Sequence, residues 1–312
     1  SAGSFDNLEV GKYKITATLS DGTTEKKKVE KTINIKNLDD MSAYLFVHFV
    51  DTQEDATREQ IYFSVSKDGK TWTTLNNKQP YLTSNVGTQG VRDPYILRGE
   101  DGKFFINLKN NWTAAAQQGS KSIVVWESSD LVNWSEASLV KINNDNAGCT
   151  WAPEACYDPE KDEYMVFWAS VVSDDSYQKY RIYRSYTKDF KTFSAPELYI
   201  EEPNAVIDTT IIDHEGTYYR FTKNEAKSSI TMQECTSLSG DWKDVANYNL
   251  GSMTGYEGPT IYKLNGKNEW CLLLDYFSKS KGYKPFVTTD ITKGEFTADS
   301  DFSFDGTYRH GT

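Results

Sequence analysis

The sequence predicts an all-β protein whose main part is a five-bladed β-propeller. Helical periodicity is absent over any window of useful length. An acidic residue opens each of four strand-like segments, 34 to 41 residues ahead of an aromatic turn. Repeats of about 40 to 50 residues made of short strands are typical of a propeller. Five such turns recur at intervals of 62, 59, 49 and 54 residues, and their aromatic residues are Trp72, Trp134, Phe193, Trp242 and Phe296.

Residues 1–38 stand apart from this repeat. Polar and apolar residues alternate on both sides of Asp21 and Gly22, which is the pattern of a β-hairpin around a turn. A lone hairpin is only marginally stable in water. The string GKYKITATLSDG resembles the last strands of bacterial immunoglobulin-like modules. We therefore expect a hairpin that is part of an immunoglobulin-like segment ahead of the propeller.

The four acid-led units share one order of strand signals. Each begins with a strand that holds the acid, continues with an aromatic-rich strand and ends with a short third strand. Proline lies within the first residues of three of the leading strands, where a missing hydrogen-bond donor is tolerated. The four acids are Asp93, Glu154, Asp208 and Glu257.

The first unit differs, because residues 43–72 supply strands with no acid-led strand before them. We expect the segment 307–312 at the other end of the chain to provide the missing inner strand. Such closure joins the two ends of the ring and leaves no open sheet edge. The predicted propeller then occupies residues 39–312, and its fifth inner strand carries no acid but contains His310.

Composition limits the classes of partner. A net charge of −11 argues against nucleic-acid binding, which needs a basic surface. Membrane insertion is not expected, because no apolar run approaches the roughly 20 residues that a spanning helix requires.

The acids indicate hydrolytic chemistry. The inner strands of a propeller run beside its axis, so side chains at their equivalent ends meet at one mouth although they are 50 or more residues apart in sequence. Crowded and partly desolvated carboxyl groups acquire different pKa values, so that one stays protonated while another is ionised. Hydrolysis of a glycosidic bond needs such a pair, because an acid protonates the leaving oxygen while a carboxylate activates water.

An ordered set of motifs resembles glycoside hydrolase family 43, whose members are five-bladed propellers that invert configuration. The motifs are RDPYI at 92–96, WAPEA at 151–155, VIDTTII at 206–212, EGPTIYK at 257–263 and YRHGT at 308–312. The resemblance implies that Asp93 is the general base, Asp208 the carboxylate that tunes the acid, and Glu257 the general acid. It also implies that Trp151 lines the sugar subsite, and that His310 binds substrate at the axis beside a calcium ion held through water. No other cofactor is implied.

Each assignment has a structural alternative. Asp93 can cap a turn, Asp208 can be an ordinary strand or turn acid, and Glu257 can belong to a surface turn. Trp151 can fill space between blades, as strand tryptophans in propellers usually do. Glu154 is not catalytic in the family, so we expect it to serve a structural hydrogen-bonding role.

The sequence therefore predicts an inverting exo-glycosidase that releases terminal furanose or pentose residues from plant or microbial polysaccharides. The preferred activity is that of an α-L-arabinofuranosidase. A β-D-galactofuranosidase and a β-xylosidase are the alternatives within the family, and a non-catalytic carbohydrate-binding propeller is the alternative outside enzymology. The residues alone do not choose among these sugars. We expect a monomer that binds an oligosaccharide or polysaccharide substrate, and such a substrate implies a secreted, periplasmic or cell-surface location in a bacterium.

Overall fold

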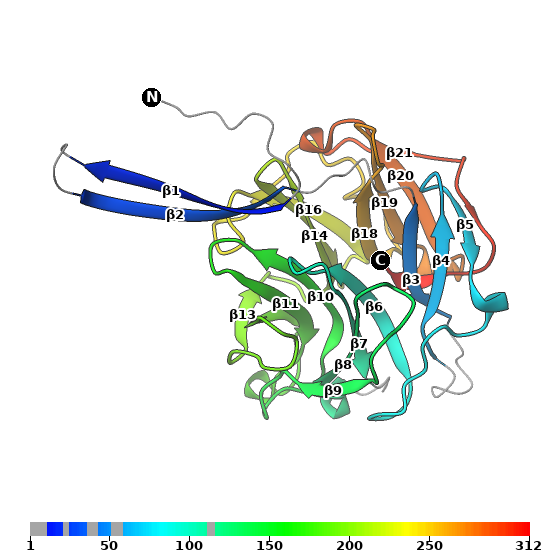
Figure 1. Cartoon of the computed structure of the whole chain (residues 1–312). Coiled ribbons are helices and arrows are strands. Elements are labelled where there is room, and N and C mark those ends of the chain that lie inside the picture. Colours follow the sequence, from blue (N-terminus) through cyan, green and yellow to red (C-terminus); the bar gives the residue numbers. More distant parts are fainter. Residues whose placement is uncertain (1–10, 21–24, 36–42, 51–58, 111–115) are drawn as a thin grey trace. The chain divides into compact units, whose positions relative to one another are not determined.

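The computed structural model describes the whole chain except residues 1–10, 21–24, 36–42, 51–58 and 111–115 (Figure 1). The chain divides into two compact units, residues 1–42 and 43–312. The boundary predicted after residue 38 lies outside the described residues. None of the described helices is long and apolar enough to cross a membrane.

The first unit contains two antiparallel strands, β1 (Gly11–Ser20) and β2 (Glu25–Ile35). Gly11 faces Ile35 at the open end of the pair. The turn predicted at residues 21 and 22 lies outside the described residues. The resemblance of this unit to an immunoglobulin-like module stays a prediction.

The second unit is the predicted five-bladed β-propeller, made of five sheets that follow one another along the chain (Figure 1). Four of the sheets have four strands each, ordered from the inner to the outer strand as they occur in the sequence. Blade II has β6 (Val91–Arg98), β7 (Phe104–Asn110), β8 (Ser122–Ser128) and β9 (Ser138–Lys141). Blade III has β10 (Trp151–Asp158), β11 (Glu163–Ser170), β12 (Arg181–Thr187) and β13 (Glu197–Ile200). Blade IV has β14 (Val206–His214), β15 (Thr217–Asn224), β16 (Ser229–Cys235) and β17 (Lys243–Asp244). Blade V has β18 (Glu257–Lys263), β19 (Trp270–Asp275), β20 (Tyr283–Thr288) and β21 (Thr297–Ala298).

Blade I closes the ring by combining both ends of the propeller. Its sheet contains β3 (Tyr44–Phe49), β4 (Tyr62–Ser66), β5 (Thr71–Thr74), β22 (Ser303–Phe304) and β23 (Arg309–Gly311). The inner strand β23 pairs with β3, and backbone hydrogen bonds of 2.7 and 3.0 Å join Thr312 to Val47. This confirms the predicted closure by the C-terminal strand. The outer strand β22 adds a parallel pairing with β5 that the sequence analysis did not foresee.

Short 3-10 helices occupy several of the connections. They are η3 (Asn76–Lys78), η4 (Ala116–Gln118), η5 (Ser173–Asp175), η6 (Phe277–Lys279) and η7 (Ile291–Lys293).

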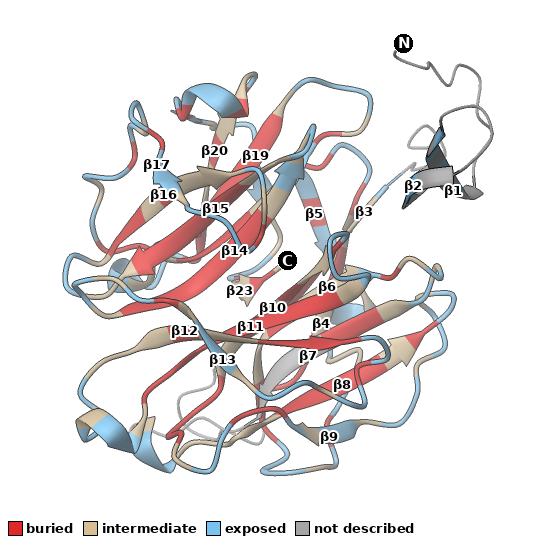
Figure 2. Cartoon of the chain, turned by 90° about the vertical axis from the view of Figure 1, so that its left-hand side faces the viewer, coloured by how far each residue is buried: buried red, intermediate tan, exposed pale blue. Residues whose placement is uncertain are grey.

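The hydrophobic core is divided among the five junctions between neighbouring blades. Buried residues follow the inner and middle strands, whereas the outer strands β9, β13 and β17 are mostly exposed (Figure 2). The junction between blades V and I is closed by aromatic packing of Phe46, Trp72, Tyr283 and Tyr308. Because each blade is packed against both neighbours, the inner strands are held in fixed positions around the axis.

Candidate active site

A β-bulge interrupts the start of every inner strand. The register shifts between Arg92 and Tyr95 in β6, and equivalent shifts occur in the inner strands of the other four blades. A bulge leaves one residue unpaired and changes the direction of its side chain, which is why bulges are common beside active sites. The heads of the inner strands are therefore built to direct side chains away from the sheet ladder.

The bulges show that the four acids are not structurally equivalent. Asp93 and Asp208 themselves adopt the left-handed conformation, with φ of 51° and 48°, and His310 occupies the same place in the bulge of β23. In blade V this position belongs to Gly258, with φ of 49°, so Glu257 lies one residue earlier. In blade III it belongs to Ala152, with φ of 44°, so Glu154 lies two residues later. Left-handed backbone at a residue other than glycine costs about 1–2 kcal/mol, and such strain is concentrated at functional sites.

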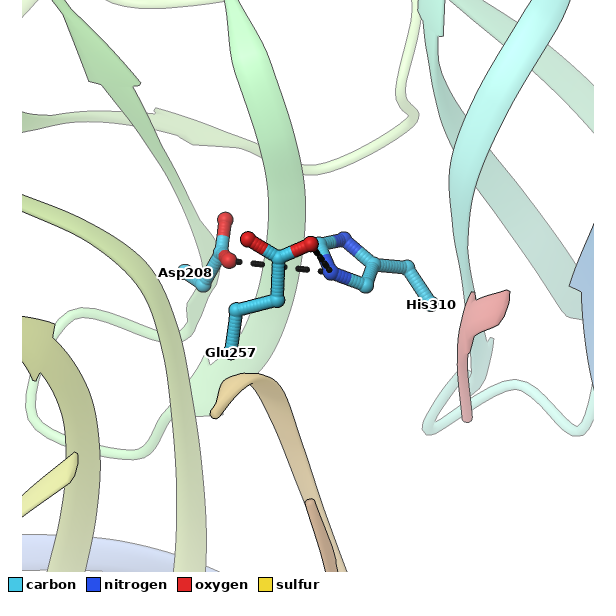
Figure 3. A group of neighbouring side chains, drawn as sticks. All are labelled: Asp208, Glu257 and His310. Atoms are coloured by element: carbon cyan, nitrogen blue, oxygen red, sulfur yellow. Dashed lines mark ion pairs between the residues drawn. The ribbon is translucent and has the colours of Figure 1, made fainter. Parts of the chain in front are cut away.

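His310 brings the three predicted catalytic carboxylates together. Its Nδ1 lies 3.2 Å from Oδ1 of Asp93, and its Nε2 lies 3.2 Å from Oε1 of Glu257. Oδ2 of Asp208 lies 3.8 Å from the same Nε2 and accepts a hydrogen bond of 3.1 Å from the backbone N–H of Gly258 (Figure 3). Residues from blades II, IV, V and I thus converge on one imidazole ring.

A small cavity lies beside this group. The heads of all five inner strands contribute to its lining, which includes Asp93, Glu154, Asp208, Gly258 and His310. Glu154 lines the cavity, and its Oε2 is buried without a hydrogen-bond partner among the described residues. Trp151 does not line the cavity, although its neighbour Ala152 does. The Trp151 ring stacks on Tyr180 at a centroid distance of 5.0 Å, so its role at a sugar subsite stays a prediction.

The sequence analysis missed two cations that hold Glu257. Nζ of Lys223 lies 2.8 Å from Oε2 of Glu257, and Nη2 of Arg309 lies 3.3 Å from Oε1. Lys223 is on the same face of β15 as Tyr219 and Phe221, and all of the residues 219–223 are buried. A lysine is almost never buried without a partner, so its place two residues after Phe221 in a strand was the available signal. Arg309 directly precedes His310 in the last motif, which was the signal for the second cation.

Comparison with known proteins identifies the family. The model of a family related to glycoside hydrolase family 43, described as "Probable glycosyl hydrolase domain", matches residues 39–312. The chain belongs to glycoside hydrolase family 43. This result confirms the family that the ordered motifs predicted. Family 43 is an inverting family, and its hydrolases need no cofactor.

One curated relative and several solved structures are similar to this family 43 chain. An α-L-arabinofuranosidase from Bifidobacterium longum subsp. longum is 28% identical over 340 residues, which cover 91% of this chain. The match covers 31% of that protein, so the chain spans about a third of its length.

Two of the solved structures share the fold. The catalytic domain of a glycoside hydrolase family 62 α-L-arabinofuranosidase from Coprinopsis cinerea has a TM-score of 0.53 at 17% identity, with 71% of both chains covered. An exo-β-1,3-galactanase from Phanerochaete chrysosporium, solved with β-1,3-galactotriose, has a TM-score of 0.53 at 18% identity. That match covers 70% of this chain and 53% of the galactanase chain. At these identities the likeness shows the fold alone.

The surroundings of Asp208 and Glu257 shift the pKa values of these two carboxyl groups in opposite directions. Burial raises the pKa of Asp208 to about 6, and the charge of Glu257 adds to the rise while His310 opposes it. Burial also raises the pKa of Glu257, but the positive charges of His310 and Lys223 outweigh it and hold that pKa at about 2. Burial lowers the pKa of His310, whereas Asp208 and Glu257 outweigh this effect and raise it well above its ordinary value. Below about pH 6 the site therefore contains a protonated Asp208, an ionised Glu257 and an imidazolium.

The same side chains are a poor match for calcium. Ligand atoms of Asp208, Glu257 and His310 lie within 4.8 Å of one another, close enough to hold a metal ion. Calcium, however, takes 6–8 oxygen ligands, and this group offers only two carboxylates and a nitrogen. Both ring nitrogens of His310 already contact carboxylates. The described residues thus do not fit directly coordinated calcium, and the predicted water-mediated ion stays a prediction.

Proposed function

We propose that this chain is an inverting exo-glycosidase that releases terminal α-L-arabinofuranosyl residues. The observation that carries the proposal is the position of Asp93 and Glu257 on the two different nitrogens of His310. These nitrogens point away from each other, so the width of the ring separates the two carboxylates. Inverting glycosidases have carboxyl groups roughly 6.5–9.5 Å apart, which leaves room for water, whereas retaining enzymes have about 5 Å.

The proposed reaction is a single displacement. Asp93 accepts a proton from water as the water oxygen attacks the anomeric carbon, and Glu257 protonates the glycosidic oxygen as its bond to that carbon breaks. Asp208 binds the N–H of Gly258, the residue after Glu257, and thereby fixes the backbone that carries the acid. Its own raised pKa keeps negative charge away from the departing oxygen below about pH 6.

Glu257 must carry a proton before it can donate one, and its pKa is low beside His310 and Lys223. The imidazolium of His310 is in direct contact with Oε1 and can transfer its Nε2 proton there. Nδ1 of the resulting neutral imidazole still carries its proton and stays 3.2 Å from Oδ1 of Asp93. Asp93 therefore releases to solvent the proton that it gained from water, and Nε2 of His310 takes up a proton from solvent, which restores all three side chains to their starting states.

The choice of arabinofuranose rests on the relative from Bifidobacterium longum, which is named as an α-L-arabinofuranosidase. Galactofuranosides and xylosides are the alternative substrates in the same active site. We also propose a secreted, periplasmic or cell-surface location, because a polysaccharide substrate is too large to be taken up intact. We propose in addition that the propeller is a monomer. A calcium ion beside the axis would be detected by metal analysis of the purified protein, and no step of the reaction is assigned to it.

The test is hydrolysis of aryl α-L-arabinofuranoside, β-D-galactofuranoside and β-D-xyloside, with the product anomer followed by NMR. We expect turnover of the arabinofuranoside with inversion, and a loss of at least about 10²-fold in kcat/KM for Asp93→Asn and for Glu257→Gln. The control is Asp101→Asn, an equivalent change at the exposed turn between β6 and β7, which should leave activity unchanged.

Three results would contradict the proposal. Product of retained configuration would exclude the single displacement, and full activity of Asp93→Asn would exclude the assigned base. Absence of turnover across the panel, with thermal stabilisation by oligosaccharides, would favour the carbohydrate-binding propeller instead.

A further inference from the structure

We propose that Asp275 is a positioning residue for the general acid, acting through Arg309 on Glu257. The inference rests on the proposed function, because it concerns the orientation of Glu257 in that reaction. Neither the motifs nor the comparisons single out Asp275, which ends β19 directly opposite Glu257 in β18.

The hydrogen-bonded connection from Asp275 to Glu257 runs through the guanidinium group of Arg309, and Oδ2 of Asp275 also lies 3.9 Å from Nε2 of His310. Its side chain is 0% exposed, and its Oδ2 accepts a hydrogen bond of 2.6 Å from Nε of Arg309. Nη2 of the same Arg309 lies 3.3 Å from Oε1 of Glu257. The guanidinium is planar and rigid, so fixing one of its nitrogens fixes the direction of the others.

The way Arg309 is shared argues against a purely structural ion pair. Nε and Nη2 of an arginine form the fork that usually binds both oxygens of one carboxylate. Here Nε binds Asp275 while Nη2 reaches Glu257, and Oδ1 of Asp275 is buried with no hydrogen-bond partner among the described residues. An unsatisfied buried polar atom costs about 1–3 kcal/mol, so its persistence calls for an explanation. Splitting the fork leaves that oxygen unsatisfied and provides Glu257 with an oriented donor.

Lys223 holds the opposite oxygen of Glu257. Its Nζ lies 2.8 Å from Oε2 and equally far from Oε1 of Glu225, and its side chain is only 4% exposed. Glu257 is thereby held at both oxygens, by β15 on one side and by β23 on the other. If Asp275 no longer restrains Arg309, Oε1 of Glu257 keeps only its contact with His310, and the carboxyl group can turn away from the leaving oxygen.

This geometry also connects ring closure to the chemistry. Arg309 and His310 both belong to β23, the strand that closes the propeller against β3. The general acid is therefore oriented by a strand that is in place only when the ring is complete.

The experiment is the leaving-group dependence of Asp275→Asn, which keeps the shape of the side chain and removes its charge. We expect kcat for a phenyl glycoside of the sugar that the wild type hydrolyses to fall about 10²-fold, as a small misplacement of a catalytic group produces. For the 2,4-dinitrophenyl glycoside, whose leaving group needs no proton, we expect kcat to fall less than about threefold. KM should remain unchanged for both substrates.

The matched control is Lys70→Met. Lys70 also bridges two carboxylates across the closing junction, with Nζ 2.8 Å from Glu269 and 2.6 Å from Asp299, but it makes no contact with Glu257 among those described. The Lys70→Met variant should have a lower melting temperature, while the ratio of its kcat values for the two substrates should stay that of the wild type. If Asp275→Asn does not fold, Arg309→Lys replaces it, because a lysine keeps the charge and loses the shared fork.

An equal fall on both substrates would overturn the positioning role and leave the proposed function intact. Wild-type protein that hydrolyses no glycoside of the panel would overturn the proposed function, and this inference with it.

Discussion

Gly258 offers the most direct test of how the bulges organise the site. This residue has φ of +49°, and a Cβ added to it would lie 2.4 Å from Cδ2 and 2.7 Å from Nε2 of His310. The substitution Gly258→Ala therefore does two separable things. It strains the backbone in the left-handed region, and it pushes the imidazole away from the carboxylates.

The two effects have different magnitudes. A left-handed alanine costs about 1–2 kcal/mol relative to glycine, which corresponds to a fall of about 2–8 °C in the melting temperature of a domain this size. Carbon atoms in ordinary contact are about 3.5 Å apart, so the ring of His310 must move by about 1 Å. Its 3.2 Å contact with Glu257 then breaks. A displacement of this size costs about 10²-fold in rate.

The assay combines thermal unfolding with kcat on an aryl glycoside. Gly266→Ala is the control, because Gly266 has φ of +67° and an added Cβ would meet nothing within 4 Å. We expect both variants to lose similar stability and only Gly258→Ala to lose activity. If Gly258→Ala retains the activity of Gly266→Ala, the contact between the bulge and His310 does not organise the site.

Three further predictions follow from other contacts. Burial lowers the pKa of His48 to about 4, so the free energy of unfolding should fall by about 3 kcal/mol as the pH drops from 6.5 to 4, because the unfolded chain binds that proton first. Urea unfolding of His48→Gln should show a shallower pH dependence than the wild type, and identical slopes would contradict the assignment. Truncation after Tyr308 removes the pairing of β23 with β3, and scanning calorimetry should show a melting temperature lower by at least about 10 °C, with no activity. Burial raises the pKa of Glu154 well above its ordinary value, so Glu154→Gln replaces one neutral group by another. The kcat of this variant should therefore stay within about threefold of the wild type. A loss as large as that of Glu257→Gln would make Glu154 catalytic.

Much of this fold could be predicted because its signals are local. Alternating strands, turn residues and recurring aromatics lie within single blades, and the short final segment had to pair somewhere to close the sheet. The parallel strand β22 was not predictable in the same way, since a strand of two residues carries no pattern. Its pairing with β5 depends on the side chains of Asp299 and Asp305, which bind Lys70 and Thr74 from more than 200 residues away in sequence.

The sequence by itself determined the order of the strands and the family, and it predicted Asp93, Asp208, Glu257 and His310 as residues of the candidate site. Only the tertiary structure decided that the acids occupy different positions relative to the β-bulges. Asp93 and Asp208 lie inside the bulges of their strands, whereas Glu257 lies one residue before the bulge of β18. It also brought Lys223, Asp275 and Arg309 around Glu257, the proposed general acid. The physical reason is that a motif records spacing along one strand. The charge around a buried carboxylate is set by strands from other blades, whose positions depend on closure of the whole ring.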